Sequence, residues 1–206
     1  MKIKGAVMAG GESRRFGRPK AFATWEDSRF YERAVDALAP ICNDVVLSVR
    51  EDQLNDFPGF SGKLVTDLPP YESCGPLGGL FALMTKTDAE VIITLPCDMP
   101  LFEKEDAEKL LNFFSSQKDI QALIPSVNGK LQPLSAVYSG SCLPVIKAQL
   151  EEGDFRMRSF FEQVNWLEVP HTGLGISEAA FSNINDQQAY EQVKQYAQRR
   201  TTDGTD

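Results

Sequence analysis

The stretch VMAGGESRRFGRPKA, from Val7 to Ala21, decides the fold predicted for this chain. It starts inside an apolar run, residues 3–9, that shows no alternation of apolar and polar positions. Such runs are typical of strands buried on both faces of a parallel sheet. In α/β sheets, ligands bind at the carboxyl ends of the strands. The stretch therefore predicts an α/β fold that opens on a buried strand followed by a ligand-binding loop.

The loop combines glycines with positive charge. Gly10 and Gly11 allow the backbone to approach a ligand closely, and free N–H groups in such a loop form a concave anion site. Four cations follow within seven residues: Arg14, Arg15, Arg18 and Lys20. The loop matches neither a Walker A motif nor the dinucleotide fingerprint G-x-G-x-x-G. Phosphate binding is the favoured interpretation, and a solvated turn with surface charge is the alternative.

The rest of the chain alternates between strand and helix patterns. We predict strands at 3–9, 44–49, 63–67, 90–96, 120–127 and 165–170, and helices at 28–40, 80–87, 103–117, 141–151, 156–163 and 186–200. Asn128-Gly129 between two strand-like runs predicts a hairpin on a type I′ turn. This order favours a three-layer α/β/α Rossmann-like domain with a mostly parallel sheet, spanning residues 1–200. Residues 201–206 are predicted to be a disordered tail.

Composition narrows the class of protein. The chain has 206 residues, of which 42% are hydrophobic, and a net charge of -8. The acidic balance argues against nucleic acid or an anionic membrane as the main partner, and no apolar run is long enough to span a bilayer. Four widely spaced cysteines form no C-x-x-C pair, which is typical of reduced thiols. With no signal-peptide pattern, we expect a cytoplasmic protein.

Four motifs together resemble those of the molybdenum cofactor guanylyltransferase family, within the sugar-nucleotidyltransferase-like enzymes. The first has the form A-G-G-x-S-x-R-[MF]-G-x-x-K-A. The others are an Asp followed by G-P-L-[AG]-G, the acidic motif C-D-x-P, and a late N-[IV]-N segment. In this chain they read AGGESRRFGRPKA (9–21), LVTDLPPYESCGPLGGLFA (64–82), LPCDMP (95–100) and FSNINDQQ (181–188). They occur in family order.

The resemblance implies a nucleotidyltransferase fold, with nucleotide binding by residues 1–100 and acceptor binding by residues 101–190. It implies a Mg²⁺-dependent transfer of GMP from GTP to the terminal phosphate of molybdopterin cofactor, with other cofactor-biosynthesis proteins as possible partners. Asp98 would hold the metal, while Arg15 and Lys20 would stabilise charge on pyrophosphate. The implied nucleotide contacts are Met8, Ala9, Gly10, Gly11, Lys20, Asp67, Gly78 and Asp98.

Alternatives remain for the residues and for the function. By itself Asp98 could cap a turn before Pro100, and Asp67 could do the same after its strand. Pro19 before Lys20 is more typical of related cytidylyltransferases and other nucleotidyltransferases. A cytidylyltransferase for the same or another phosphorylated acceptor is therefore one alternative. A non-catalytic adaptor that binds nucleotide and cofactor is another. Arg156 and Arg158 are further candidates for contacts to acceptor phosphate.

Overall fold

The computed structural model describes residues 1–10 and 19–203, with side chains up to residue 199. Its main sheet has the strand order β10-β7-β9-β6-β1-β4-β5, with β8 paired to β7. The strands are β1 (Ile3–Met8), β4 (Asp44–Ser48), β5 (Lys63–Val65), β6 (Val91–Pro96), β7 (Ala122–Val127), β8 (Lys130–Leu131), β9 (Val137–Ser139) and β10 (Trp166–Pro170). The mainly parallel α/β fold predicted from the sequence is confirmed.

The apolar runs at residues 3–9 and 90–96 form the central strands β1 and β6 of this sheet. β1 lies between β4 and β6 and pairs with both in parallel. Every residue of β6 is buried, as expected for a strand that helices cover on both faces. β4 in turn pairs in parallel with β5 at the sheet edge. The four strands therefore point in one direction, and their carboxyl ends share one edge of the sheet.

The second half of the chain adds a mixed region to this sheet. β7 and β8 form the predicted hairpin, and Asn128 and Gly129 have φ values of 50° and 73°, as a type I′ turn requires. The chain then returns as β9, which pairs antiparallel with both β6 and β7. β9 therefore joins the two parallel groups, because β10 pairs with β7 in parallel.

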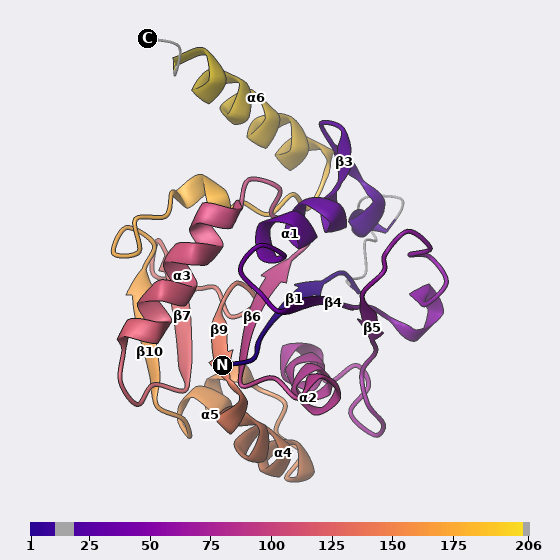
Figure 1. The fold of residues 1–206 in the computed structure, drawn as a ribbon, viewed down its shortest axis with the longest axis vertical. Coiled ribbons are helices and arrows are strands. Elements are labelled where there is room, and N and C mark those ends of the chain that lie inside the picture. The colour runs from indigo at the N-terminus through magenta and orange to yellow at the C-terminus, as the bar shows by residue number, and fades with distance from the viewer. Residues whose placement is uncertain (11–18, 204–206) are drawn as a thin grey trace.

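Helices cover both faces of the sheet (Figure 1). One face carries α1 (Phe30–Leu38) and α3 (Lys104–Ser116), which pack on Val7, Leu47 and Ile93. The other carries α2 (Gly75–Thr87), α4 (Leu143–Glu151) and α5 (Met157–Phe161), which pack on Ala6 and Ile92. Consecutive residues of one strand thus point to opposite faces of the sheet and pack in two separate hydrophobic cores. This arrangement gives the predicted three layers.

Some helix boundaries differ from the predictions. α1 begins at Phe30 because Ser28 belongs to the short strand β3 (Ser28–Arg29), so Ser28 is not the predicted cap. Glu32 accepts a hydrogen bond from Arg29 N at 2.7 Å instead. α2 begins at Gly75, inside the predicted loop, because Pro76 fits the first turn of a helix, where no N–H is needed.

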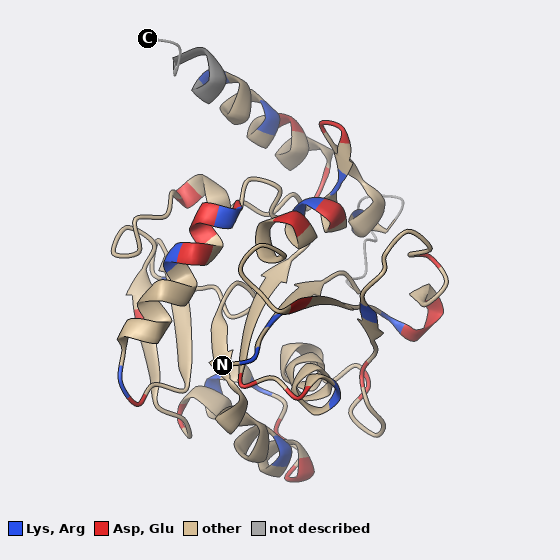
Figure 2. Cartoon of the chain, in the orientation of Figure 1, with Lys and Arg blue, Asp and Glu red and all other residues tan. Residues whose placement is uncertain are grey.

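The terminal helix α6 (Gln187–Asp203) extends away from the sheet (Figure 1). It continues three residues beyond the predicted end at 200, and residues 204–206 lie outside the described part of the chain. Trp25, Phe30, Ile184 and Val193 form a small core that holds its first turns. Both α1 and α3 carry acidic and basic residues (Figure 2). Within the described residues, no helix is both long and apolar enough to cross a bilayer.

Candidate active site at the carboxyl edge of the sheet

The ends of the four parallel strands are aligned residue by residue. Met8 of β1 lies opposite Ser48 of β4 on one side and Pro96 of β6 on the other. Ser48 in turn pairs with Val65 of β5. The segments that follow these strands therefore leave the sheet at the same edge. These segments contain Ala9, Gly10, Lys20, Asp67 and Asp98, whereas Met8 is the last residue of β1 and Gly78 lies in α2.

A lysine and an aspartate from two of these segments form the centre of the site. Lys20 opens the short helix η1 (Lys20–Phe22), and Asp98 follows the end of β6. The Lys20 Nζ lies 3.0 Å from Asp98 Oδ2, and the side chains are only 17% and 18% exposed. Within the described residues, the Asp98 carboxylate accepts no backbone N–H. The turn-capping alternative for Asp98 therefore has no support there.

The late asparagine segment joins the same cluster from the far end of the sequence. Asn185 Oδ1 accepts a hydrogen bond from Lys20 Nζ. Ile184 N donates to the main-chain oxygen of Asp98 at 2.9 Å, and the Ile184 side chain is fully buried. The segment thus contacts both members of the Lys20–Asp98 pair. The late motif made Asn183 and Asn185 candidates for a place near the metal or acceptor, with a plain loop role as the alternative, and the structure brings Asn185 to Lys20.

The backbone after β1 is held tightly against the neighbouring strands. Ala9 N donates to Ser48 O at 2.8 Å, and Met8 O accepts from Cys97 N at 3.2 Å. A Cβ on Gly10 would lie 3.1 Å from Arg50 N, so the chain passes close to the segment after β4. Met8, Ala9 and Gly10 therefore lie where a backbone contact to a ligand is possible. Gly11 and Arg15, with Arg14 and Arg18, lie outside the described residues.

Asp67 lies on the same edge after β5. Its side chain is half-buried, and Oδ2 accepts a hydrogen bond from Ser73 N at 3.3 Å. Burial raises the pKa of the Asp67 carboxyl, while the Ser73 N–H opposes this shift and favours the charged form. A Cβ on Gly79 would lie 3.3 Å from Met8 Cε and 3.8 Å from Asp67 Oδ1. Gly79 thus faces the site, although the sequence analysis named Gly78, and not Gly79, as the nucleotide contact.

Gly78, the predicted nucleotide contact in α2, is buried and packs against the preceding loop. A Cβ at this position would lie 2.8 Å from Tyr71 O and 3.2 Å from Cys74 Cβ. The missing side chain thus lets α2 approach the loop that contains Ser73. Because Ser73 N holds Asp67, Gly78 can influence the site through this loop.

We expect Gly78→Ala to lower stability by about 1–3 kcal/mol, because the added methyl group must displace backbone. For a chain of this size, this corresponds to a decrease in Tm of roughly 2–12 °C. The matched control is Gly79→Ala, where the nearest atom is the flexible end of Met8. Thermal unfolding of the two variants checks the expectation. Equal Tm values for both would show that Gly78 does not require the absence of a Cβ.

Other reactive side chains do not join this cluster. Cys97 is adjacent to Asp98, but it is buried, and burial raises its pKa to about 12, so the thiolate is disfavoured. His171 Nδ1 lies 2.8 Å from Ile176 O, within a turn after β10. The described residues contain no group of three or more His, Cys, Asp or Glu side chains that could hold a metal ion.

Known proteins support the architecture and the family. The chain matches the model of the MobA-like NTP transferase domain over residues 5–169. It is 36% identical over 182 residues to a probable molybdenum cofactor guanylyltransferase of Halalkalibacterium halodurans, covering 88% of this chain and 92% of that protein. A protein of Bacillus subtilis with the same name is 32% identical, covering 90% and 91%.

A solved structure has the same fold. Molybdopterin-guanine dinucleotide biosynthesis protein A from Archaeoglobus fulgidus superimposes with a TM-score of 0.77 at 21% identity, covering 95% of this chain and 99% of that one. The matched domain begins before Met8 and extends past the β7–β8 hairpin, so it includes the sheet edge built above. The chain therefore belongs to the MobA-like NTP transferase family.

Proposed function

We propose that the protein transfers GMP from GTP to the terminal phosphate of molybdopterin cofactor, with release of pyrophosphate. The supporting observation is the Lys20–Asp98 pair at the shared carboxyl edge of β1, β4, β5 and β6. The relatives named as guanylyltransferases cover most of the chain, which supports GTP as the nucleotide.

The reaction needs positioning and charge stabilisation more than acid–base chemistry. An acceptor phosphate is already anionic at neutral pH, so one of its oxygens can attack the α-phosphorus of GTP without a general base. A new bond forms between the acceptor oxygen and the α-phosphorus. The bond between the α-phosphorus and the oxygen that bridges to the β-phosphate breaks, and pyrophosphate leaves with that electron pair. The Lys20 ammonium would stabilise the charge that develops on the leaving group.

The residues present fit a Mg²⁺ ion shared with the substrate. Asp98 supplies a hard oxygen ligand that is partly exposed at the sheet edge. Mg²⁺ is usually bound by one or two carboxylates together with substrate phosphates and water, so a lone protein carboxylate is sufficient. When bound, the ion would polarise the phosphoryl oxygens and neutralise their charge. Lys20 would orient the Asp98 carboxylate, and Asn185 would orient Lys20.

Pyrophosphate release from GTP and from CTP, with Mg²⁺ and molybdopterin cofactor as acceptor, tests the proposal. We expect GTP-dependent turnover with formation of the guanine dinucleotide, and little turnover with CTP. A preference for CTP would assign the cytidylyltransferase activity instead. Tight nucleotide binding without turnover of either nucleotide would favour the non-catalytic adaptor.

A further inference from the structure

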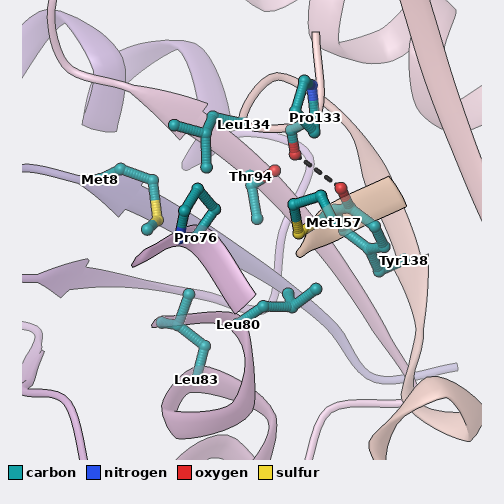
Figure 3. Close-up of a pocket in the computed structure, with 9 residues that line it drawn as sticks. All are labelled: Met8, Pro76, Leu80, Leu83, Thr94, Pro133, Leu134, Tyr138 and Met157. Atoms are coloured by element: carbon teal, nitrogen blue, oxygen red, sulfur yellow. Dashed lines mark hydrogen bonds between the residues drawn. The ribbon is translucent and has the colours of Figure 1, made fainter. Parts of the chain in front are cut away.

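The two halves of the domain meet at a narrow apolar pocket beside the candidate active site (Figure 3). Met8 and Pro76 reach it from the half assigned to the nucleotide, and Pro133, Leu134 and Met157 reach it from the other half. Thr94 of β6, four residues before Asp98, also lines it. The pocket therefore places the beginning of α5 next to the carboxyl ends of β1 and β6.

A buried amide fixes the backbone in front of α5. Gln149 of α4 is 1% exposed, and its Nε2 donates to Asp154 O at 3.1 Å and to Arg156 O at 2.9 Å. Its Oε1 accepts a hydrogen bond from Gln163 Nε2 at 3.0 Å. Both amide hydrogens and the oxygen are thus used. Burying an amide is costly unless all its bonds are made, so this contact defines one conformation of residues 153–157.

The segment held in this way presents an aromatic ring and cations to solvent. Phe155 lies between the two carbonyl groups that Gln149 binds and is 44% exposed. The Arg158 side chain is 91% exposed and lies 3.4 Å from Glu162. Arg156 is bound by Asp154 through two hydrogen bonds, at 2.9 and 2.6 Å. An exposed ring and exposed guanidinium groups in one short segment suit a ligand with a planar ring and an anionic group.

We propose that residues 153–158 form the acceptor side of the active site and that Gln149 is the positioning residue that holds them there. This inference rests on the proposed function, because the acceptor is taken to be a pterin that carries a phosphate. Phe155 would pack against the pterin ring, and Arg158 would attract the phosphate. Gln149 contacts no substrate and acts only through the two backbone carbonyls that it binds.

The test uses Gln149→Glu, which keeps the shape of the side chain but removes both donors. The matched control is Gln121→Glu, because Gln121 also bridges backbone and side chain, through Asn165 N and Ser141 Oγ, outside this segment. The KM values for GTP and for molybdopterin cofactor are measured separately for each variant. We expect Gln149→Glu to raise the acceptor KM about tenfold, since two hydrogen bonds are lost, while the KM for GTP stays within about twofold.

Limited trypsin digestion provides a readout that does not depend on activity. We expect Gln149→Glu to be cut faster after Arg156 and Arg158 than wild type, whereas Gln121→Glu is cut as slowly as wild type. Phe155→Ala covers the case in which Gln149→Glu fails to fold, because this exposed ring can be removed without opening the core. Phe155→Ala is expected to raise the acceptor KM, unlike Tyr196→Ala, which removes a comparably exposed ring on α6.

The outcomes separate this inference from the proposed function. If the wild-type protein forms no guanine dinucleotide, the proposed function is wrong and the acceptor role of the segment is lost with it. If the wild-type protein is active but Gln149→Glu and Phe155→Ala leave the acceptor KM unchanged, the inference alone is overturned. An equal rise in the KM values for GTP and acceptor would also overturn it, because it would indicate general damage to the fold.

Discussion

Asp98→Ala is expected to reduce GMP transfer by at least about a hundredfold, with little change in Tm. The expected size follows from other enzymes, in which loss of one preorganised electrostatic group costs roughly 10²–10³ in rate. Asp98 lies two residues beyond the aligned ends of β1 and β6, and within the described residues its carboxylate contacts the side chain of Lys20. Its removal therefore leaves the backbone hydrogen bond from Ile184 to Asp98 O in place.

Asp98→Asn separates charge from shape. The amide oxygen can still accept the hydrogen bond from Lys20, but it lacks the negative charge that attracts Mg²⁺. We expect nearly the same loss of activity as in Asp98→Ala, measured as pyrophosphate release at several Mg²⁺ concentrations. The control is Asp44→Ala, because Asp44 also pairs with a lysine, Lys4, but at the amino end of the sheet. Full activity in Asp98→Asn would exclude a role for the charge of Asp98.

Lys20→Met is the second substitution for which we expect a large effect, a fall in kcat of about a hundredfold. Methionine keeps most of the length of the side chain but removes the ammonium group. The pair that Lys20 forms with Asp98 is largely shielded from solvent, so its charge is weakly screened. Lys20→Arg is expected to recover only part of the activity, because a planar guanidinium cannot reproduce a compact ammonium between Asp98 and Asn185.

Lys4→Met is the matched control for Lys20→Met. The Lys4 side chain is 16% exposed and paired with Asp44, which resembles the environment of Lys20, but it lies at the opposite edge of the sheet. A double-mutant cycle with Asn185→Ala then measures whether Asn185 acts through Lys20. If it does, the Asn185 substitution costs activity in the wild-type background and little in Lys20→Met. Independent, additive effects would mean that Asn185 acts separately from Lys20.

Local sequence patterns were sufficient to predict most of the strands and the hairpin turn. The continuous apolar runs of residues 3–9 and 90–96 predicted the two central strands, because strands covered on both faces leave no polar alternation. Asn128-Gly129 predicted the turn of the β7–β8 hairpin, because only residues that tolerate positive φ fit a type I′ turn. The start of α2 was missed because the glycines and prolines of residues 68–79 suggested a loop. There, the packing of Gly78 against Tyr71 favours the helix.

The sequence by itself predicted the parallel α/β order, favoured phosphate binding by the loop after β1, and identified Lys20, Asp67 and Asp98 as candidates. Only the tertiary structure decided which of them meet. Lys20 and Asp98 are 78 residues apart, and Asn185 is 165 residues from Lys20, yet all three converge. No local pattern encodes such contacts, because they arise from strand order and from the return of the chain along the sheet edge. The position of β9 between β6 and β7 has the same origin, since pairing partners depend on the whole sheet.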